Sequence, residues 1–236
     1  MIKHSTREFD GWYANHPLDA LFTEVSALQP PGDIAEIGVH QGKMFCSIVQ
    51  LLRPGERALA IDLFENQDEN VDNSGCGNRV KFEENLSRCV GPAWKEVVDV
   101  WAINSKVLIP SDFNGRKIRI FSIDGGHTSD YVLHDLEVAQ HVMVEDMPLI
   151  VVDDYYHTGW HGVFQGTNHF LRRHGDAWKP VYVSPLYGGS NKLILTRAKD
   201  AEMLAKRLSG RYMNTYDGIK LPETKPVSDV SLPVYN

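Results

Sequence analysis

Short apolar runs alternate with amphipathic stretches along most of this chain, and that alternation limits its fold more than any other feature. It is typical of a sheet of parallel strands, because each crossover between parallel strands needs a segment about as long as a helix. Strands are expected at residues 34–38, 58–62, 97–103, 118–124, 149–154, 180–184 and 192–196. Helices are expected at residues 44–52, 82–90, 129–143 and 163–174, where apolar residues lie three and four apart. The predicted fold class is α/β: a single doubly wound, mostly parallel seven-stranded sheet with helices on both faces.

The two ends of the chain differ from this alternating region. Residues 1–32 form a leader with helical character, which ends at a Pro-Pro-Gly breaker. Residues 33–197 form the α/β domain, and residues 198–236 form one more amphipathic helix followed by an extended, proline-rich tail. The oligomeric state is left open, with the leader and the tail as candidate contacts in a homo-oligomer.

Composition narrows the class of partner. The net charge of −7 and the lack of clustered Lys and Arg argue against nucleic acid, so a small-molecule partner is expected. Cys46, Cys76 and Cys89 are odd in number and lack the spacing of a zinc site or a disulfide framework, which favours the reducing cytoplasm. No stretch resembles a signal peptide or is apolar for the roughly twenty residues that cross a bilayer, so no membrane partner is expected.

The loop after the first strand, within EIGVHQGKMF, indicates the kind of cofactor. Gly38 permits a tight turn, and Gly42 lets the next helix begin close to a ligand. The dinucleotide fingerprint G-x-G-x-x-G is absent, which counts against NAD and FAD. Glu36 would repel a pyrophosphate but attract an amino group, unless it is only a surface residue beside an ordinary turn. Asp62 ends the second strand, where an acid can accept hydrogen bonds from two ribose hydroxyls. A nucleoside with an amino tail and no phosphate satisfies both acids.

These residues carry a family resemblance. The run AEIGVHQGKM, with Asp62 closing the next strand, resembles the class I S-adenosylmethionine-dependent methyltransferases. The resemblance implies that the glycine turn faces the methionine part of the cofactor and that Asp62 holds its ribose. It also implies that Asn104 and Ser105 flank the adenine, although Asn-Ser after a strand is equally a helix N-cap.

Three carboxylates are expected to meet at the edge where the strands end. Asp124 follows the fourth strand, while Asp153 and Asp154 end the fifth. Neighbouring strands lie about 5 Å apart, so the three acids would repel one another unless a cation or a proton neutralised them. Mg²⁺ prefers oxygen ligands and keeps waters that a substrate can replace, which predicts a catalytic magnesium site. The alternative is that the Asp-Asp pair caps a helix.

The combination of IDGGH with VVDDY is similar to the metal-dependent macrocin-type sugar O-methyltransferases and their broader relatives, over roughly residues 33–175. This resemblance implies that Asp124, Asp153 and Asp154 bind Mg²⁺, that Asp124 also belongs to the catalytic and cofactor-binding residues, and that His127 is the general base. The implied acceptor is a hydroxyl of a sugar, glycoside or similar polar metabolite.

The chemistry is consistent with these roles. A hydroxyl near Mg²⁺ loses its proton more easily, and the ordinary pKa of histidine suits His127 to accept that proton. His127 could instead cap the helix that follows it.

His157, Trp160 and His161 are candidates for an acceptor pocket or lid, or for a loop packed on its own domain. The long polar segment 63–78 is a candidate flap or partner contact.

Two alternatives to a methyltransferase stay open at this point. One is a nucleotide-dependent oxidoreductase on a related fold, against which Glu36 and the missing third glycine count. The other is a non-catalytic module that binds S-adenosylmethionine, which would not need the acid cluster or His127.

Overall fold

The computed structural model describes residues 2, 5–13, 17–184, 191–208, 215–216 and 219–220. The helices are α1 (Pro17–Ser26), α2 (Phe45–Ile48), α3 (Arg79–Cys89), α4 (Ser129–Val142), α5 (His161–His174) and α6 (Ala198–Leu208). The strands are β1 (Asp33–Ile37), β2 (Ala58–Asp62), β3 (Val98–Ala102), β4 (Ile118–Ile123), β5 (Leu149–Val152), β6 (Trp178–Val183), β7 (Leu193–Arg197), β8 (Thr215–Tyr216) and β9 (Ile219–Lys220). The tail predicted after Lys220 lies outside the described residues.

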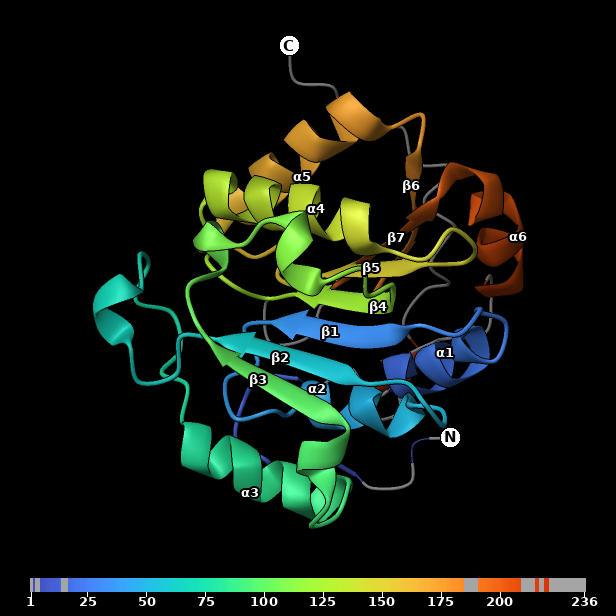
Figure 1. The fold of residues 1–236 in the computed structure, drawn as a ribbon. Coiled ribbons are helices and arrows are strands. Elements are labelled where there is room, and N and C mark those ends of the chain that lie inside the picture. The colour runs from blue at the N-terminus through green and yellow to red at the C-terminus, as the bar shows by residue number, and fades with distance from the viewer. Residues whose placement is uncertain are drawn as a thin grey trace.

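Seven strands form one sheet in the order β3-β2-β1-β4-β5-β7-β6 (Figure 1). β1 pairs in parallel with β2 and β4, and the neighbouring pairs β2–β3 and β4–β5 are also parallel. β7 runs antiparallel to both β5 and β6. The connection from β6 to β7 is too short for a crossover helix, so these two strands form an antiparallel pair. The predicted fold class is confirmed.

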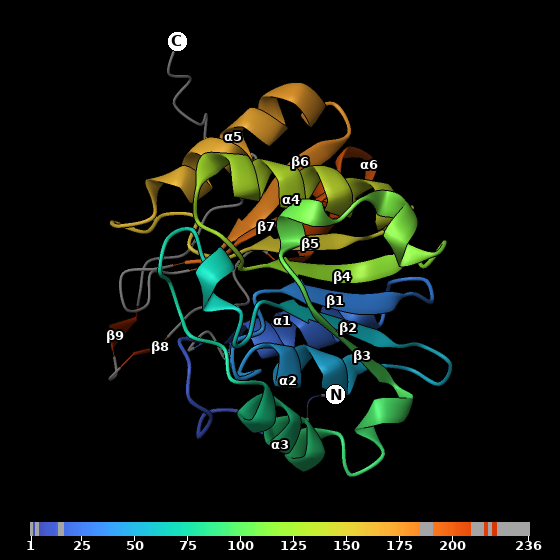
Figure 2. The same cartoon turned by 60° about the vertical axis from the view of Figure 1, so that its left-hand side comes forward.

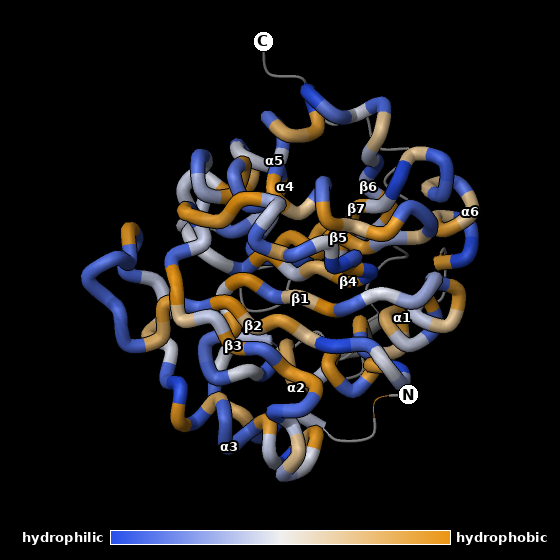
Figure 3. Tube along the Cα trace, viewed as in Figure 1, coloured by the Kyte–Doolittle hydropathy of each residue, from blue (hydrophilic) through white to orange (hydrophobic). Residues whose placement is uncertain are grey.

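Helices cover both faces of the sheet and create two apolar cores. Successive residues of β1 point to opposite faces, so that Ile34 belongs to one core and Ala35 to the other. The first core also contains buried side chains of α1, α2, α3 and α6, while the second contains those of α4 and α5. Apolar colour concentrates on the central strands, whereas the long connection after β2 is mainly hydrophilic (Figure 3). In the described part of the chain, no helix is long and apolar enough to span a membrane.

The helix predicted over residues 44–52 is shorter than expected. It forms only α2, continued by a single 3-10 turn at Val49–Leu51. Leu52 then adopts an extended conformation, two residues before Pro54. The turn at Val49–Leu51 is a 3-10 turn and Leu52 has left the helical conformation, so residues 49–52 do not continue α2.

A buried arginine ties the leader to the sheet. Arg119 of β4 donates to Glu56 at 2.9 Å, and both side chains are almost completely buried. The same guanidinium donates to Ser26 Oγ at 2.8 Å and to Gln29 Oε1 at 3.1 Å. The end of α1 is therefore bonded directly to the central strands of the domain.

The parallel strands all end at one edge of the sheet, and the order of strands reverses direction there between β1 and β4. Such a reversal leaves a crevice outside the carboxyl ends of the strands, where ligands of open α/β sheets bind. The connection between β2 and α3 also stands at this edge (Figure 2). The fold therefore brings the predicted site residues to one place.

Candidate active site

A cavity of about 730 Å³ opens at this edge. Loops that follow β1, β2, β3, β4 and β5 contribute to its wall, together with Trp12 of the leader and Lys192 before β7. Of the predicted site residues, those that line it are Gly38, Asp62, Asn104, Ser105, Asp124, His127, Asp153 and Asp154. Glu36 and Gly42 are not among the lining residues.

Gly38 allows the loop after β1 to touch the end of β4. Its φ angle is +83°, and a Cβ atom at this position would lie 1.8 Å from the carbonyl oxygen of Asp124. No side chain fits there, so the close approach requires glycine. At Gly42, by contrast, a Cβ would lie 2.8 Å from the ring of Phe82 in α3. Gly42 thus packs against a helix, and its contact with a cofactor stays a prediction.

Glu36 lies beneath this turn and is 1% exposed. Ser122 Oγ donates to its Oε1 at 3.4 Å, and Oε2 has no hydrogen-bond partner among the described residues. Burial raises the pKa of Glu36 to about 8, although the charge of Lys192 opposes this shift. A buried carboxyl group with an unpartnered oxygen is compatible with a ligand that carries an amino group, but that role stays a prediction.

Asp62 is fixed at the end of β2 by two main-chain amides. The N–H of His40 donates to one carboxylate oxygen at 2.7 Å, and the N–H of Phe64 donates to the other at 2.6 Å. Burial raises the pKa of Asp62, while these two bonds act in the opposite direction. Because a carboxylate oxygen has two lone pairs, each oxygen can still accept a ribose hydroxyl.

Asn104 and Ser105 have structural contacts as well as positions in the cavity wall. The Asn104 side chain accepts from Lys106 N at 3.0 Å and thereby caps the 3-10 turn Ser105–Val107. Ser105 Oγ donates to Asp135 at 3.2 Å. The helix-cap interpretation is therefore correct for Asn104, and it is compatible with the predicted contact to adenine.

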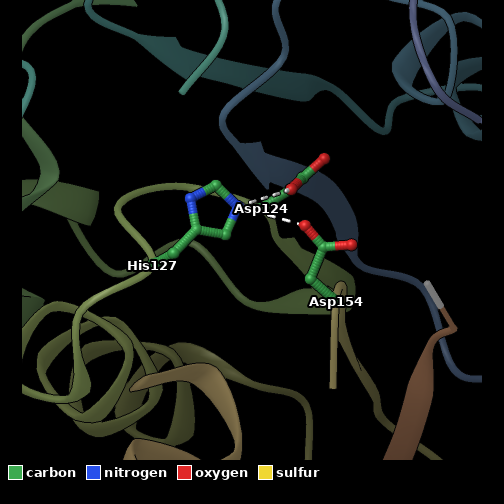
Figure 4. A group of neighbouring side chains, drawn as sticks. All are labelled: Asp124, His127 and Asp154. Atoms are coloured by element: carbon green, nitrogen blue, oxygen red, sulfur yellow. Dashed lines mark ion pairs between the residues drawn. The ribbon is translucent and has the colours of Figure 1, made fainter. Parts of the chain in front are cut away.

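Asp124, His127 and Asp154 converge beside the Gly38 turn (Figure 4). One ligand atom from each of the three lies within 4.8 Å of the other two. Nε2 of His127 lies 3.2 Å from Asp154 Oδ2 and 3.9 Å from Asp124 Oδ1. Burial and the neighbouring charge of Asp153 raise the pKa of Asp124 well above its ordinary value. Carboxylates held this close together favour a proton or a cation between them.

Asp153 lies at the same edge but has a different partner. Its Oδ2 forms an ion pair with Lys192, and its Oδ1 accepts from the N–H of Asp154 at 2.8 Å. Burial alone would lower the pKa of Lys192, but Asp153 and Asp124 outweigh burial and raise it, so the ammonium stays charged. Lys192 was not singled out from the sequence. A lysine at the start of an apolar strand, in KLILT, is the signal that could have identified it.

A family model described as "Methyltransferase domain" matches residues 35–155, which is more than half of the chain. The chain belongs to this methyltransferase family. The match includes both strands whose ends supply the acid cluster, and it confirms the enzyme class expected from the sequence over the oxidoreductase alternative.

Solved methyltransferases have a similar fold. CalS11, a TDP-rhamnose 3'-O-methyltransferase of calicheamicin biosynthesis, has a TM-score of 0.55 and 16% identity over 75% of this chain and 77% of its own. TomG from Streptomyces achromogenes is an O-methyltransferase of tomaymycin synthesis solved with S-adenosylmethionine. Its TM-score is 0.56, with 18% identity over 76% of this chain and 78% of its own. An O-methyltransferase from Bacillus cereus, solved with S-adenosylhomocysteine, has a TM-score of 0.57 and 14% identity over 81% of this chain and 84% of its own. At these identities the likeness shows the fold alone. No curated protein matches the sequence.

His127 of this methyltransferase domain is enclosed by contacts that the sequence did not indicate. Asp72, from the connection between β2 and α3, contacts both its main chain and its ring. Trp160 stacks on the ring with centroids 4.5 Å apart and an interplanar angle of 21°. Gly162 of α5 lies so close that a Cβ would be 2.3 Å from the carbonyl oxygen of His127. The ring is therefore held from several sides and does not project into solvent.

The aromatic loop of the methyltransferase domain contributes in part as expected. His157 and Trp160 line the cavity, and their rings stack with centroids 5.8 Å apart. His161 begins α5, is exposed, and is not among the lining residues. The acceptor-pocket role stays a prediction, and the cavity wall is compatible with it for His157 and Trp160 but not for His161.

Proposed function

We propose that the protein is an S-adenosylmethionine-dependent, Mg²⁺-dependent O-methyltransferase that acts on a hydroxyl of a sugar, glycoside or similar polar metabolite. The convergence of Asp124, Asp154 and His127 in a cavity of a methyltransferase domain carries the proposal. A metal site, a base and a methyl donor would then meet at one edge of the sheet.

The donor set fits a hard divalent cation. Asp124 and Asp154 present carboxylate oxygens to one volume, and oxygen is the ligand atom that Mg²⁺ prefers. Asp153 completes the proposed set, because each of its oxygens keeps a lone pair beyond its bond to Lys192 or to the Asp154 amide. An imidazole suits softer metals, so we assign the Nε2 atom of His127 to proton transfer.

The cofactor would lie along the loops after β1, β2 and β3. The fixed carboxylate of Asp62 would accept the ribose hydroxyls, and Asn104 and Ser105 would flank the adenine. The turn at Gly38, with Glu36 beneath it, would face the methionine part, and Gly42 would position the following turn. S-adenosylmethionine and S-adenosylhomocysteine in the structures of TomG and the Bacillus cereus enzyme support this choice of cofactor.

His127 would accept the proton of the acceptor hydroxyl at Nε2. Burial alone would lower its pKa, but hydrogen bonds to Asp154 and Asp72 raise it to about 9, so these two carboxylates alone would keep the ring protonated near neutral pH. Mg²⁺ bound by Asp154 would offset the charge of that carboxylate and lower this pKa, which would free Nε2 to accept a proton. When bound, Mg²⁺ would supply positive charge that makes a nearby hydroxyl easier to deprotonate. The acceptor oxygen attacks the sulfonium methyl, the new O–C bond replaces the S–C bond, and the proton moves to Nε2. Much of the rate would come from holding the two substrates in line.

The lining of the cavity supports a polar, ring-shaped acceptor. Trp12, His157 and Trp160 contribute aromatic rings to the same cavity wall as the carboxylates, a combination that can both pack against and hydrogen-bond to a sugar. CalS11, which has a similar fold, is a TDP-rhamnose 3'-O-methyltransferase, and this also favours a sugar. We propose no nucleic-acid or membrane partner, and a cytoplasmic location stays the prediction from the cysteines.

The proposed division of the chain keeps residues 33–197 as the methyltransferase domain. The leader, 1–32, and the segment 198–236 are proposed as additions to it and as candidate contacts in a homo-oligomer. Buried side chains of α1 and α6 join the same core as the strands, so these additions would also stabilise the domain.

The proposal is tested by measuring S-adenosylhomocysteine after incubation with S-adenosylmethionine, Mg²⁺ and a panel of acceptors. The panel contains free sugars, glycosides and nucleotide-linked sugars, and parallel reactions contain EDTA. We expect turnover with at least one sugar-type acceptor, its loss in EDTA, and its loss in Asp153→Ala with cofactor affinity nearly intact. Activity that persists in EDTA refutes the role of the metal. Cofactor binding without any turnover favours a non-catalytic binding module.

A further inference from the structure

Asp72 and His127 are in direct contact, although they are 55 residues apart in sequence. The main-chain N–H of His127 donates to Asp72 Oδ2 at 2.6 Å. The ring atom Nδ1 lies 3.0 Å from the same oxygen. Two contacts from one residue to one carboxylate oxygen fix both the position of His127 and the rotation of its ring.

The other oxygen of Asp72 is used within its own segment. Oδ1 accepts from Ser74 N at 3.0 Å and from Ser74 Oγ at 2.5 Å. Asn70 Nδ2 donates to the carbonyl oxygens of Ser74 at 2.9 Å and Gly75 at 3.3 Å. Contacts within its own loop therefore orient the Asp72 carboxylate independently of its contact with His127.

The environment of the pair strengthens the interaction. The side chains of Asp72 and His127 are each only 9% exposed. Burial would raise the pKa of Asp72, but the bonds from His127 and Ser74 outweigh it and hold that pKa well below its ordinary value. Asp72 thus stays a carboxylate, which can only accept hydrogen bonds.

The other ring nitrogen of His127, Nε2, faces the acid cluster of Asp124 and Asp154. With Nδ1 turned to Asp72, Nε2 points to Asp154 and Asp124 at the cavity wall. Nε2 also faces a carboxylate, but the proposed function assigns the Asp154 oxygens to Mg²⁺, so Asp72 is the carboxylate that retains a ring proton. A histidine whose Nδ1–H donates to a carboxylate keeps the lone pair of its neutral form on Nε2. That is the atom to which the proposed function assigns proton transfer.

We infer that Asp72 is a positioning residue of the methyltransferase: its carboxylate holds His127 with Nδ1–H toward the segment 63–78 and Nε2 toward the acceptor hydroxyl. The inference rests on the proposed function for its catalytic meaning. It makes the segment 63–78 a part of the active site, even though no residue of that segment was assigned a role from the sequence.

The competing explanation is that Asp72 only fastens the segment 63–78 to the domain. In that case its loss would affect folding or substrate affinity but would not change which ring nitrogen of His127 carries the proton. The two explanations therefore differ in the ¹⁵N chemical shifts of the ring and in whether kcat or KM changes.

The experiment compares wild type, Asp72→Asn and Asp68→Asn, each labelled with ¹⁵N-histidine. Asp68 is an exposed acid of the same segment and does not line the cavity, so it is the matched control. Spectra are recorded with Mg²⁺ and S-adenosylhomocysteine, above the pH at which the ring loses its charge, and a His127→Gln spectrum assigns the signals. We expect a protonated Nδ1 in wild type and Asp68→Asn, and a shift toward protonated Nε2 in Asp72→Asn.

The kinetic arm uses the acceptor found in the screen. We expect kcat of Asp72→Asn to fall about 10- to 100-fold, the range typical when a partner that orients a functional histidine is removed. KM and the affinity for S-adenosylmethionine should match those of Asp68→Asn, and Asp72→Glu should recover part of kcat. Unchanged ¹⁵N shifts in Asp72→Asn, or a change in KM alone, overturns the inference.

The two proposals can fail separately. A wild-type protein that methylates no acceptor removes the proposed function and with it the catalytic role of Asp72. A wild-type protein that is active, while Asp72→Asn keeps both its kcat and its ring tautomer, removes only the role of Asp72.

Discussion

Nε2 of His127 lies 3.2 Å from Oδ2 of Asp154, although the two residues follow different strands of the sheet. His127 stands in the loop after β4, and Asp154 in the loop after β5. Because β4 and β5 pair in parallel, both loops begin at the same edge, and the contact follows from the topology. The same edge contains the Gly38 turn, so the proposed base, the proposed metal ligands and the proposed cofactor loop line one cavity.

Gly38→Ala should destabilise the protein much more than Gly115→Ala. Both glycines have positive φ, but a Cβ at Gly38 would collide with the Asp124 carbonyl, whereas a Cβ at Gly115 would meet nothing within 4 Å. We expect Gly115→Ala to lower the free energy of unfolding by about 1 kcal/mol and Gly38→Ala by about 3 kcal/mol or more. Urea denaturation measures both values. Equal losses would show that the contact with Asp124 is unimportant.

Asp62→Asn should weaken the binding of S-adenosylmethionine without unfolding the protein. An amide cannot accept with both of its polar atoms, so one of the ribose or main-chain bonds is lost. A hydrogen bond to a charged group contributes about 1.5–3 kcal/mol, which corresponds to roughly a 10- to 100-fold rise in Kd. Calorimetry measures the Kd, with the exposed Asp176→Asn as control. Wild-type affinity in Asp62→Asn would remove Asp62 from the cofactor site.

Lys192→Met should leave the carboxylate of Asp153 without its cationic partner. The Lys192 side chain is 3% exposed and that of Asp153 is 17% exposed, so water compensates little. Breaking a buried pair in this way costs about 3 kcal/mol of unfolding free energy. Mg²⁺ should restore part of this loss if it binds beside Asp153, because a ligand of the folded state stabilises it. Thermal melts with and without Mg²⁺ measure the effect, and a loss that Mg²⁺ leaves unchanged argues against Asp153 as a ligand.

Asp135→Asn should flatten the dependence of stability on pH. Burial raises the pKa of Asp135 to about 7, against a hydrogen bond from Ser105. The folded protein therefore binds this proton more tightly than the unfolded chain, and the contribution to stability is lost as pH rises from about 4 to about 7. At pH 8 we expect Asp135→Asn to be more stable than wild type by roughly 2–4 kcal/mol.

Denaturation at several pH values checks this prediction, with Glu202→Gln as the control because Glu202 is exposed on α6. A wild-type protein whose stability is constant between pH 4 and pH 8, or an Asp135→Asn protein that keeps the wild-type slope, would contradict it. Asp135 bonds to Ser105 in the cavity wall, so the variant also shows whether its carboxyl supports that wall.

The strands were the part of the fold that the sequence predicted well. Runs such as LIVV at Leu149–Val152 are buried on both faces of the sheet, so each residue in them is apolar and the run is easy to recognise. α2 was predicted too long because apolar spacing alone does not distinguish an α-helix from the 3-10 turn that follows Ile48. The ends of helices depend on local backbone restrictions that the periodic pattern leaves out.

The candidate site was predicted in part. Asp124 and Asp154 lie together because parallel strands end at one edge, a rule that needs no knowledge of side-chain packing. The partners Asp72 and Lys192 were missed, because their contacts join segments that are 55 and 39 residues apart and depend on how long connections fold. The prediction of Mg²⁺ rests on the acid cluster, and the pairing of Asp153 with Lys192 makes Asp124 and Asp154 its principal proposed ligands.

The central claim is that this acid cluster binds a divalent cation beside the methyl donor. Anomalous diffraction from crystals grown with Mn²⁺ and S-adenosylhomocysteine tests it most directly. We expect an anomalous peak within coordination distance of the Asp124 and Asp154 carboxylates, next to the sulfur of the bound cofactor, and no such peak in Asp154→Asn crystals. Cofactor density at the Gly38 turn together with no Mn²⁺ peak at the acid cluster would contradict the claim.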